Sequence, residues 1–201
     1  MKLYFSPGAC SLAPHIALRE AGLTFDTEKV DLRAKTTASG GSFLDVNPKG
    51  YVPALTLDDG DLMTEVATVL QYIADKANGA DLAPKYGTTE RYRLMEWLTF
   101  VSSELHKGIG SMFNPAMPDG FKPAVIERVQ ARLAVLDKHL AGKNYIMGDK
   151  FSVADAYAFT VINWTKLMNI DISQHKNVTA FMARVAARPK VQDALKAEGL
   201  I

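Results

Sequence analysis

The chain has 201 residues, of which 48% are apolar and 22% are charged, and this is enough to bury a sizeable core as one or two globular domains. A formal net charge of +1 gives no reason to expect a nucleic acid or an anionic membrane as partner, since both favour a strongly basic surface. Cys10 is the only cysteine, which excludes an internal disulfide and a metal site built from several thiolates.

The expected compartment follows from the same features. A single free thiol suits a reducing compartment. The first apolar run stops at Ser6 after three apolar residues, so we expect no signal peptide. No segment is long and apolar enough to span a bilayer. We therefore expect a cytoplasmic protein that has no membrane partner.

The first part of the chain alternates short apolar runs with helical patterns, which predicts an α/β unit with a mixed sheet. Asp58-Asp59-Gly60 is a strong hairpin-turn signal between two of the strands, and we expect Thr64 to cap the helix that follows. The expected strands are residues 2–5, 25–30, 54–57 and 62–63, and the expected helices are residues 10–21 and 64–76.

The second part reads as long helices separated by Pro and Gly. We expect these helices at residues 88–110, 122–141, 152–169, 177–187 and 190–196. A polar stretch rich in helix breakers, which begins at Asn78, is the best domain boundary. We therefore predict a first domain over residues 1–80, a linker over 81–87 and an all-helical domain over 88–201. Ser152 and Asp155 have the spacing of a capping box, and the aromatic residues around them are expected to be core.

Cys10 lies where the first strand should turn into the first helix. A helix N-terminus favours the thiolate, which is the reactive form of cysteine, although an isolated cysteine is more often a small buried hydrophobe. Ser11 could donate to a nearby sulfur anion or could simply cap the helix. No second thiol follows Cys10, so any redox chemistry there needs an external thiol and passes through a mixed disulfide.

Two further segments could bind an extended, charged ligand. If Pro53 is cis, the backbone of Val52 could pair with a peptide-like ligand as an added strand would; the alternative is an ordinary rigid turn. Glu65 could bind an ammonium group, and the N–H of Val66 could bind a carboxylate. Glu65 could equally do no more than complement the helix dipole.

In the helical part, Thr99, Ser103 and His106 have the spacing of one helix face. They form a polar stripe on an otherwise apolar helix. A lone histidine in such a stripe is more often structural than catalytic.

Four segments together resemble one known family, the bacterial beta-class glutathione S-transferases. They are Ser6-Pro7-Gly8-Ala9-Cys10-Ser11-Leu12, Val46-Asn47-Pro48-Lys49-Gly50-Tyr51-Val52-Pro53-Ala54-Leu55, Ser103-Glu104-Leu105-His106-Lys107 and Phe151-Ser152-Val153-Ala154-Asp155-Ala156-Tyr157. The likeness runs over essentially the whole chain. It implies a thioredoxin-like domain with a four-stranded mixed sheet, a C-terminal helical bundle domain, and a homodimer that binds glutathione in a cleft of each subunit.

The resemblance also implies the roles of individual residues. Cys10 would contact or covalently hold the glutathione sulfur. The other glutathione contacts would be Lys35 to the glycyl end, Val52 before a cis Pro53 to the cysteinyl backbone, Glu65 and Val66 to the γ-glutamyl end, and Thr99, Ser103, Glu104 and His106 from the helical domain, including that of the partner subunit. His106 and Trp164 would border the pocket for the hydrophobic second substrate.

The sequence departs from the family pattern at two binding positions. Val66 stands where a serine often assists and Thr99 where an asparagine is common, and both changes could weaken glutathione binding. Phe5 stands where some relatives have tyrosine. Activation of the sulfur would therefore depend on Cys10, Ser11, backbone N–H groups and His106.

The resemblance implies a glutathione transferase that conjugates reduced glutathione to small hydrophobic electrophiles in detoxification and uses no metal. Two alternatives stay open. One is a glutathione-dependent thiol-disulfide reductase or dehalogenase that acts through Cys10. The other is a non-catalytic glutathione-binding or ligand-binding module, because a fold alone does not fix a function.

Overall fold

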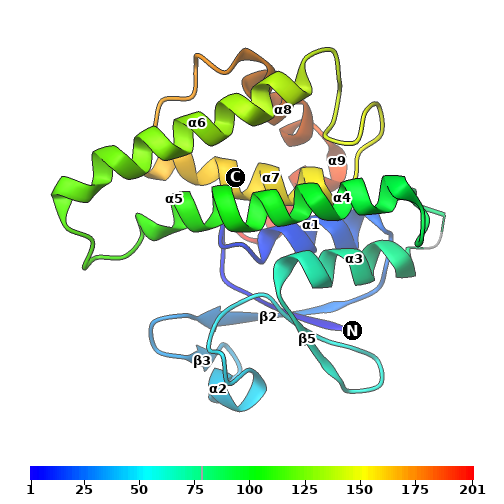
Figure 1. Ribbon diagram of the computed structural model, residues 1–201. Coiled ribbons are helices and arrows are strands. Elements are labelled where there is room, and N and C mark those ends of the chain that lie inside the picture. Colours follow the sequence, from blue (N-terminus) through cyan, green and yellow to red (C-terminus); the bar gives the residue numbers. More distant parts are fainter. Residues whose placement is uncertain (78) are drawn as a thin grey trace. The chain divides into compact units, whose positions relative to one another are not determined.

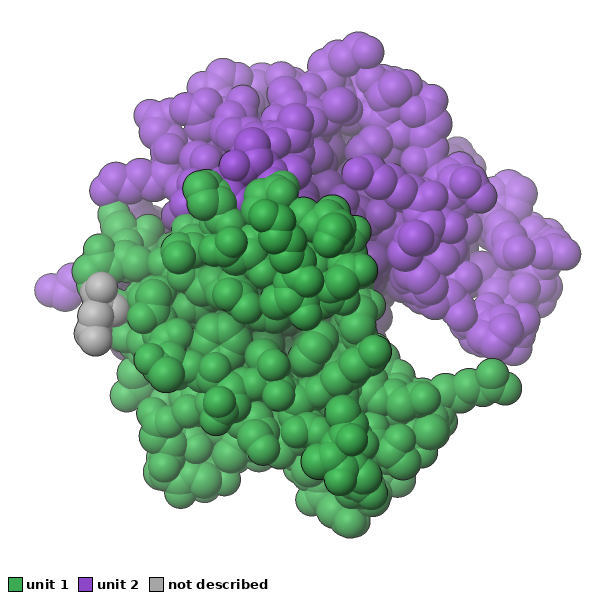
Figure 2. Space-filling view, turned by 180° about the vertical axis from the view of Figure 1, so that it is seen from behind, with its two compact units in different colours: residues 1–82, 189–201 green, residues 83–188 purple. Residues whose placement is uncertain are grey.

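The computed structural model describes residues 1–77 and 79–201; Asn78, which begins the predicted polar boundary, lies outside the described residues. The chain divides into two compact units, which Figure 2 distinguishes by colour. Unit 1 contains residues 1–82 and 189–201, and unit 2 contains residues 83–188.

Unit 1 is built on a mixed sheet. Its strands are β1 (Lys2–Phe5), β2 (Asp26–Asp31), β3 (Thr36–Thr37), β4 (Ala54–Thr56) and β5 (Leu62–Thr64), in the order β3-β2-β1-β4-β5. β1 pairs parallel with β2 and antiparallel with β4. The predicted mixed sheet is confirmed, but it has five strands where four were expected. The extra strand, β3, consists of two threonines paired with the end of β2, too short and too polar to leave a pattern in the sequence.

Helices cover both faces of this sheet (Figure 1). They are α1 (Leu12–Glu20), α2 (Phe43–Val46), α3 (Val66–Lys76) and α9 (Pro189–Ala197). α1 packs against both α3 and α9, and Phe5 of β1 faces α1, where its ring lies 5.8 Å from that of His15. Tyr4 points to the opposite face, because side chains alternate along a strand, and packs against Phe43 of α2.

The start of α3 differs from the prediction. Thr64 does not cap this helix; it is the last residue of β5 and pairs with Ala54. Glu65 is the N-cap residue instead, with a backbone φ of +67°. A non-glycine residue with positive φ is costly and is often found at a functional site.

Unit 2 is entirely helical over its described elements. These are α4 (Thr89–Phe100), η1 (Val101–His106), α5 (Lys107–Ser111), η2 (Asp119–Phe121), α6 (Lys122–Leu140), α7 (Val153–Leu167) and α8 (Lys176–Ala186). η1 is a π-helical segment between α4 and α5, so the helix expected over 88–110 contains a wider turn that no local sequence signal predicts. α7 lies at the centre of the unit, in contact with η1, α4, α5 and α8.

Asp155 fixes the start of α7. Its carboxylate accepts hydrogen bonds from the backbone N–H of Ser152 at 2.7 Å and from the Ser152 hydroxyl at 2.8 Å. It also accepts one from the backbone N–H of Ile146 at 2.7 Å. The predicted capping arrangement is confirmed, and it additionally ties the preceding loop to the helix.

The compact units differ from the predicted domain boundaries at the end of the chain. α9 buries Val191, Ala194 and Leu195 and packs on α1, so it groups with unit 1 although the helical domain was expected over 88–201. Among the described helices, none has the length and apolarity needed to cross a membrane.

Candidate functional site

Cys10 lies in the turn between β1 and α1. Its Sγ donates a hydrogen bond to the backbone oxygen of Val52 at 3.1 Å, and the side chain is partly exposed. The turn itself is closed by backbone hydrogen bonds from Ala9 to Ser6 and from Leu12 to Ala9. The thiol is thus held beside the first turn of α1, where the helix dipole favours an anion.

The loop of residues 47–53 presents the backbone of Val52. The Val52–Pro53 peptide bond is cis, as the resemblance implies. Asn47 is 1% exposed, and its side-chain amide donates to the backbone oxygen of Tyr51 at 2.7 Å while its Oδ1 accepts from the N–H of Lys49. No sequence pattern predicts a role for Asn47, yet its side chain holds this loop together.

Glu65 faces the same loop. Its carboxylate accepts a hydrogen bond from Lys49 Nζ at 2.8 Å and one from the Tyr51 hydroxyl at 2.6 Å. The hydrogen bond to Glu65 raises the pKa of Lys49 above its ordinary value, and it also raises the pKa of Tyr51. Glu65 is therefore an exposed carboxylate that already binds an ammonium group. Val66, the next residue, is buried at the first position of α3.

Lys35 reaches the loop from the segment between β2 and β3. Its Nζ donates to the backbone oxygen of Gly50 at 2.6 Å, and its own φ is +57°. Three predicted residues from different elements, Cys10, Lys35 and Glu65, therefore all bond to residues 47–53. This convergence is the main feature of the site in unit 1.

Ser11 has a different position from the one expected. It is fully buried, and its Oγ donates to the backbone oxygen of Ser6 at 3.3 Å and accepts from the Ser6 N–H at 3.1 Å. Because the single hydroxyl proton is directed at Ser6, Ser11 fixes the turn and does not offer that proton to a sulfur. It makes no side-chain capping bond to α1 either.

In unit 2, two hydroxyl groups of the polar stripe form hydrogen bonds within the helix itself. Thr99 Oγ1 donates to the backbone oxygen of Met95, and Ser103 Oγ donates to that of Thr99. Glu104 binds Arg132 Nε at 2.6 Å and Arg128 at 3.2 Å. The hydrogen bond from Arg132 lowers the pKa of Glu104 below its ordinary value, so Glu104 links η1 to α6.

His106 ends the π-helical segment and meets two aromatic residues of α7. Its Nδ1 lies 2.7 Å from the Tyr157 hydroxyl, and its ring lies 5.0 Å from that of Trp164 in an edge contact. Phe113 also packs against Trp164, with 5.5 Å between the two ring centroids. From the sequence, Tyr157 is expected only to be core, because nothing in the pattern links it to a histidine 51 residues away.

Comparison with known proteins identifies this combination of folds. Residues 8–76 match the family described as Glutathione S-transferase, N-terminal domain, and residues 100–189 match Glutathione S-transferase, C-terminal domain. Glutathione S-transferase GstA of Escherichia coli O157:H7 is 44% identical over 200 residues, covering 100% of both chains.

Two solved structures extend the comparison. A sphingomonad glutathione S-transferase complexed with glutathione is 49% identical with a TM-score of 0.96, and the match covers 100% of each chain. A bacterial beta class glutathione S-transferase of Sphingomonas chungbukensis is 51% identical with a TM-score of 0.96, again over 100% of each chain. A thioredoxin-like unit and a helical unit of this kind define the glutathione transferase fold. The chain belongs to the glutathione S-transferase family, and the predicted beta-class resemblance is confirmed.

Proposed function

We propose that this protein is a glutathione transferase that binds reduced glutathione on unit 1 and conjugates it to small hydrophobic electrophiles. The observation that carries this proposal is the convergence of Cys10, Lys35 and Glu65 on residues 47–53. A thiol, an ammonium group, a carboxylate and the backbone of Val52 before a cis proline are the groups that complement a tripeptide with a thiol, two carboxylates and an ammonium.

Each part of glutathione has a matching group. The cysteinyl backbone pairs with Val52 as an added strand would. Lys35 binds the glycyl carboxylate, and Glu65 takes the γ-glutamyl ammonium as a charge-assisted hydrogen bond partner. The first backbone N–H groups of α3 receive the γ-glutamyl carboxylate, because a helix N-terminus favours an anion. The sulfur then lies near Cys10.

In the conjugation reaction, the glutathione thiol loses its proton and the thiolate attacks an electrophilic carbon. A carbon–sulfur bond forms, and a leaving group such as a halide departs with the bonding electron pair. The protein contributes orientation and stabilisation of the thiolate. Cys10 acts here as a neighbour of the sulfur. We propose that His106 accepts the proton of the glutathione thiol and that Trp164 contacts the electrophile. We assign Thr99 and Ser103 to glutathione binding.

Partial exposure of the Cys10 thiol favours thiol exchange as a second candidate function. In that reaction the Cys10 thiolate attacks the glutathione sulfur of a disulfide between glutathione and another thiol compound, and it releases that compound as a thiolate while Cys10 keeps the glutathione as a mixed disulfide. A second glutathione thiolate then attacks the mixed disulfide, which regenerates Cys10 and forms oxidised glutathione. Cys10 is indispensable for this route.

The test is to measure the rate of glutathione conjugation to an activated aryl halide for the native protein and for Cys10→Ala side by side. The transferase proposal expects clear activity that persists at least in part in the variant. Conjugation that disappears entirely in the variant would show that Cys10 is required for conjugation and would contradict its role as a neighbour of the sulfur. Activity in neither protein would contradict conjugation to this class of electrophile.

Assembly and cellular role complete the proposal. We infer a homodimer, which light scattering on the purified protein tests directly. We also infer a cytoplasmic role in detoxification, because a free thiol and a glutathione substrate both suit a reducing compartment.

A further inference from the structure

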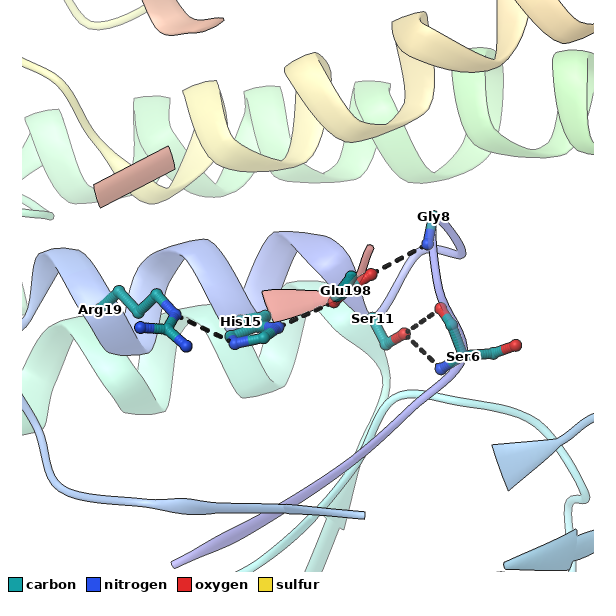
Figure 3. Close-up of polar contacts among 6 residues, drawn as sticks. All are labelled: Ser6, Gly8, Ser11, His15, Arg19 and Glu198. Atoms are coloured by element: carbon teal, nitrogen blue, oxygen red, sulfur yellow. Dashed lines mark hydrogen bonds and ion pairs between the residues drawn. The ribbon is translucent and has the colours of Figure 1, made fainter. Parts of the chain in front are cut away.

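A buried polar cluster lies behind the turn that carries Cys10, and it consists of Gly8, His15, Arg19 and Glu198 (Figure 3). Glu198 Oε2 accepts a hydrogen bond from the backbone N–H of Gly8 at 2.9 Å, and Glu198 Oε1 lies 2.8 Å from His15 Nδ1. Arg19 Nε donates to His15 Nε2 at 3.1 Å. The side chains of His15 and Glu198 are 1% and 0% exposed, so this is a built polar site inside unit 1.

The cluster has one consistent arrangement of protons. Arg19 can only donate, so His15 Nε2 accepts and the ring proton lies on Nδ1, which donates to Glu198. His15 is then a neutral relay between a guanidinium and a carboxylate. The rings of Phe5 and Phe25 lie 5.8 Å and 5.6 Å from that of His15, and these apolar neighbours strengthen the hydrogen bonds by excluding water.

Glu198 is held in place by the backbone at the end of α9. Gly199, with a φ of +70°, donates its N–H to the backbone oxygen of Lys196, and the N–H of Leu200 bonds to that of Leu195. This is the Schellman pattern, in which Glu198 is the C-cap residue. Its carboxylate is therefore presented from a rigid helix end. That end also covers Gly8, where an added Cβ would lie 3.5 Å from Leu200.

The other end of the cluster is the turn itself. Gly8 has a φ of +70°, and its N–H donates to Glu198 through the bond just described. In the same turn, the N–H of Ser6 donates a hydrogen bond to Ser11 Oγ. The turn is thus bonded at Ser6 and at Gly8, and the Gly8 bond is the one supplied from a distant part of the sequence.

We propose that Glu198 is a positioning residue: with the relay through His15 and Arg19, it fixes the turn at Gly8 and thereby sets where the Cys10 thiol lies relative to Val52 and to glutathione. This inference deepens the proposed function and rests on it only for the catalytic readout. Glu198 is not proposed to contact the substrate.

The decisive variant is Glu198→Gln, which keeps the size of the side chain but replaces one acceptor oxygen by a donor nitrogen. One of the Gly8 and His15 N–H groups then faces another donor. The matched control is Val191→Ala, which weakens the packing of the buried face of α9, the helix whose C-cap residue is Glu198, without touching the cluster. Both variants are compared at a temperature where each is folded by circular dichroism.

Three readouts are taken on each protein. The first is amide exchange at Gly8. The second is the ¹⁵N chemical shifts of His15, which identify the protonated ring nitrogen. The third is kcat/KM for glutathione in conjugation. We expect the native protein to show the Nδ1–H form. In Glu198→Gln we expect Gly8 exchange to accelerate about tenfold or more and kcat/KM to fall about tenfold, whereas Val191→Ala keeps the native tautomer and a native kcat/KM.

The outcomes separate the inference from the function. Equal exchange and equal kcat/KM in Glu198→Gln and Val191→Ala would overturn the positioning role, because the cluster would then only add stability. A native His15 with its proton on Nε2 would overturn the relay. If the native protein lacks transferase activity, the proposed function fails, and the exchange rate together with the rate of Cys10 alkylation by iodoacetamide still tests the positioning role.

Discussion

Cys10 Sγ donates a hydrogen bond to the backbone oxygen of Val52, a residue 42 positions further along the chain. The bond joins the only thiol of the chain to the backbone that we propose pairs with glutathione. Cys10→Ser keeps a donor at this position but removes the nucleophile, so we predict that conjugation continues while the mixed disulfide with glutathione disappears. Intact-protein mass spectrometry after incubation with oxidised glutathione measures this. A glutathione adduct on Cys10→Ser would contradict the assignment.

Asp155 gives a prediction about stability. Its carboxylate accepts from the backbone N–H groups of Ile146 and Ser152, and both donors lose their partner in Asp155→Ala. We predict a loss of about 2 kcal/mol or more in the free energy of unfolding near pH 7, the cost of buried unsatisfied donors and a lost cap. Urea unfolding measures it. Asp149→Ala, at an exposed position of the preceding loop, is the control and should change stability by less than about 0.5 kcal/mol.

The same carboxyl predicts a pH dependence. Burial raises the pKa of Asp155 from its ordinary value of 3.8 to about 6, even though its hydrogen bonds act in the opposite direction. The folded state therefore binds a proton that the unfolded state has already released, and stability from this group falls as pH rises from about 4 to 6, by about 3 kcal/mol.

Urea titrations at several pH values test this dependence. The difference in unfolding free energy between the native protein and Asp155→Ala should be larger at pH 4 than at pH 7. A difference that grows with pH instead would show that the hydrogen bonds outweigh burial.

Much of unit 1 was predictable because its signals are local. A short apolar run marks β1, and Asp58-Asp59-Gly60 marks the β4–β5 hairpin. β3 and α2 were missed because they contain two and four residues, too few for any period to show. The start of α3 was misplaced by the assumption that Thr64 caps it, whereas β5 continues through Thr64 and the chain turns at Glu65.

The candidate site was only partly predictable for a different reason. Cys10, Val52 and Glu65 stand in short recognisable motifs. Glu198 could not be found, because its partner His15 is 183 residues away and no pattern connects them. Tyr157 resembles an ordinary core residue, since it is 1% exposed on an apolar helix. The role of its hydroxyl becomes visible only through its contact with His106.

Tyr157 yields a prediction about the helical unit. Its hydroxyl lies 2.7 Å from His106 Nδ1, so Tyr157→Phe releases the imidazole from a fixed orientation. We predict a fall in kcat for conjugation of about threefold to tenfold with little change in KM for glutathione, consistent with a loss of about 1 kcal/mol from one neutral hydrogen bond. Steady-state kinetics measure it. Tyr145→Phe, which removes a hydroxyl bonded to Arg188, is the control, and equal effects of both changes would contradict a role for His106.

We propose that unit 1 binds glutathione through residues 47–53 and the groups that meet there. Calorimetric titration of the native protein and of Glu65→Gln with reduced glutathione tests it most directly. We predict saturable binding with one glutathione per chain, weakened about tenfold or more in Glu65→Gln, because a charged hydrogen bond contributes about 1.5–3 kcal/mol. Asp61→Asn, an exposed neutralisation on the nearby hairpin, should leave the affinity unchanged. Absence of binding to the native protein, or the same affinity in all three proteins, would contradict the account.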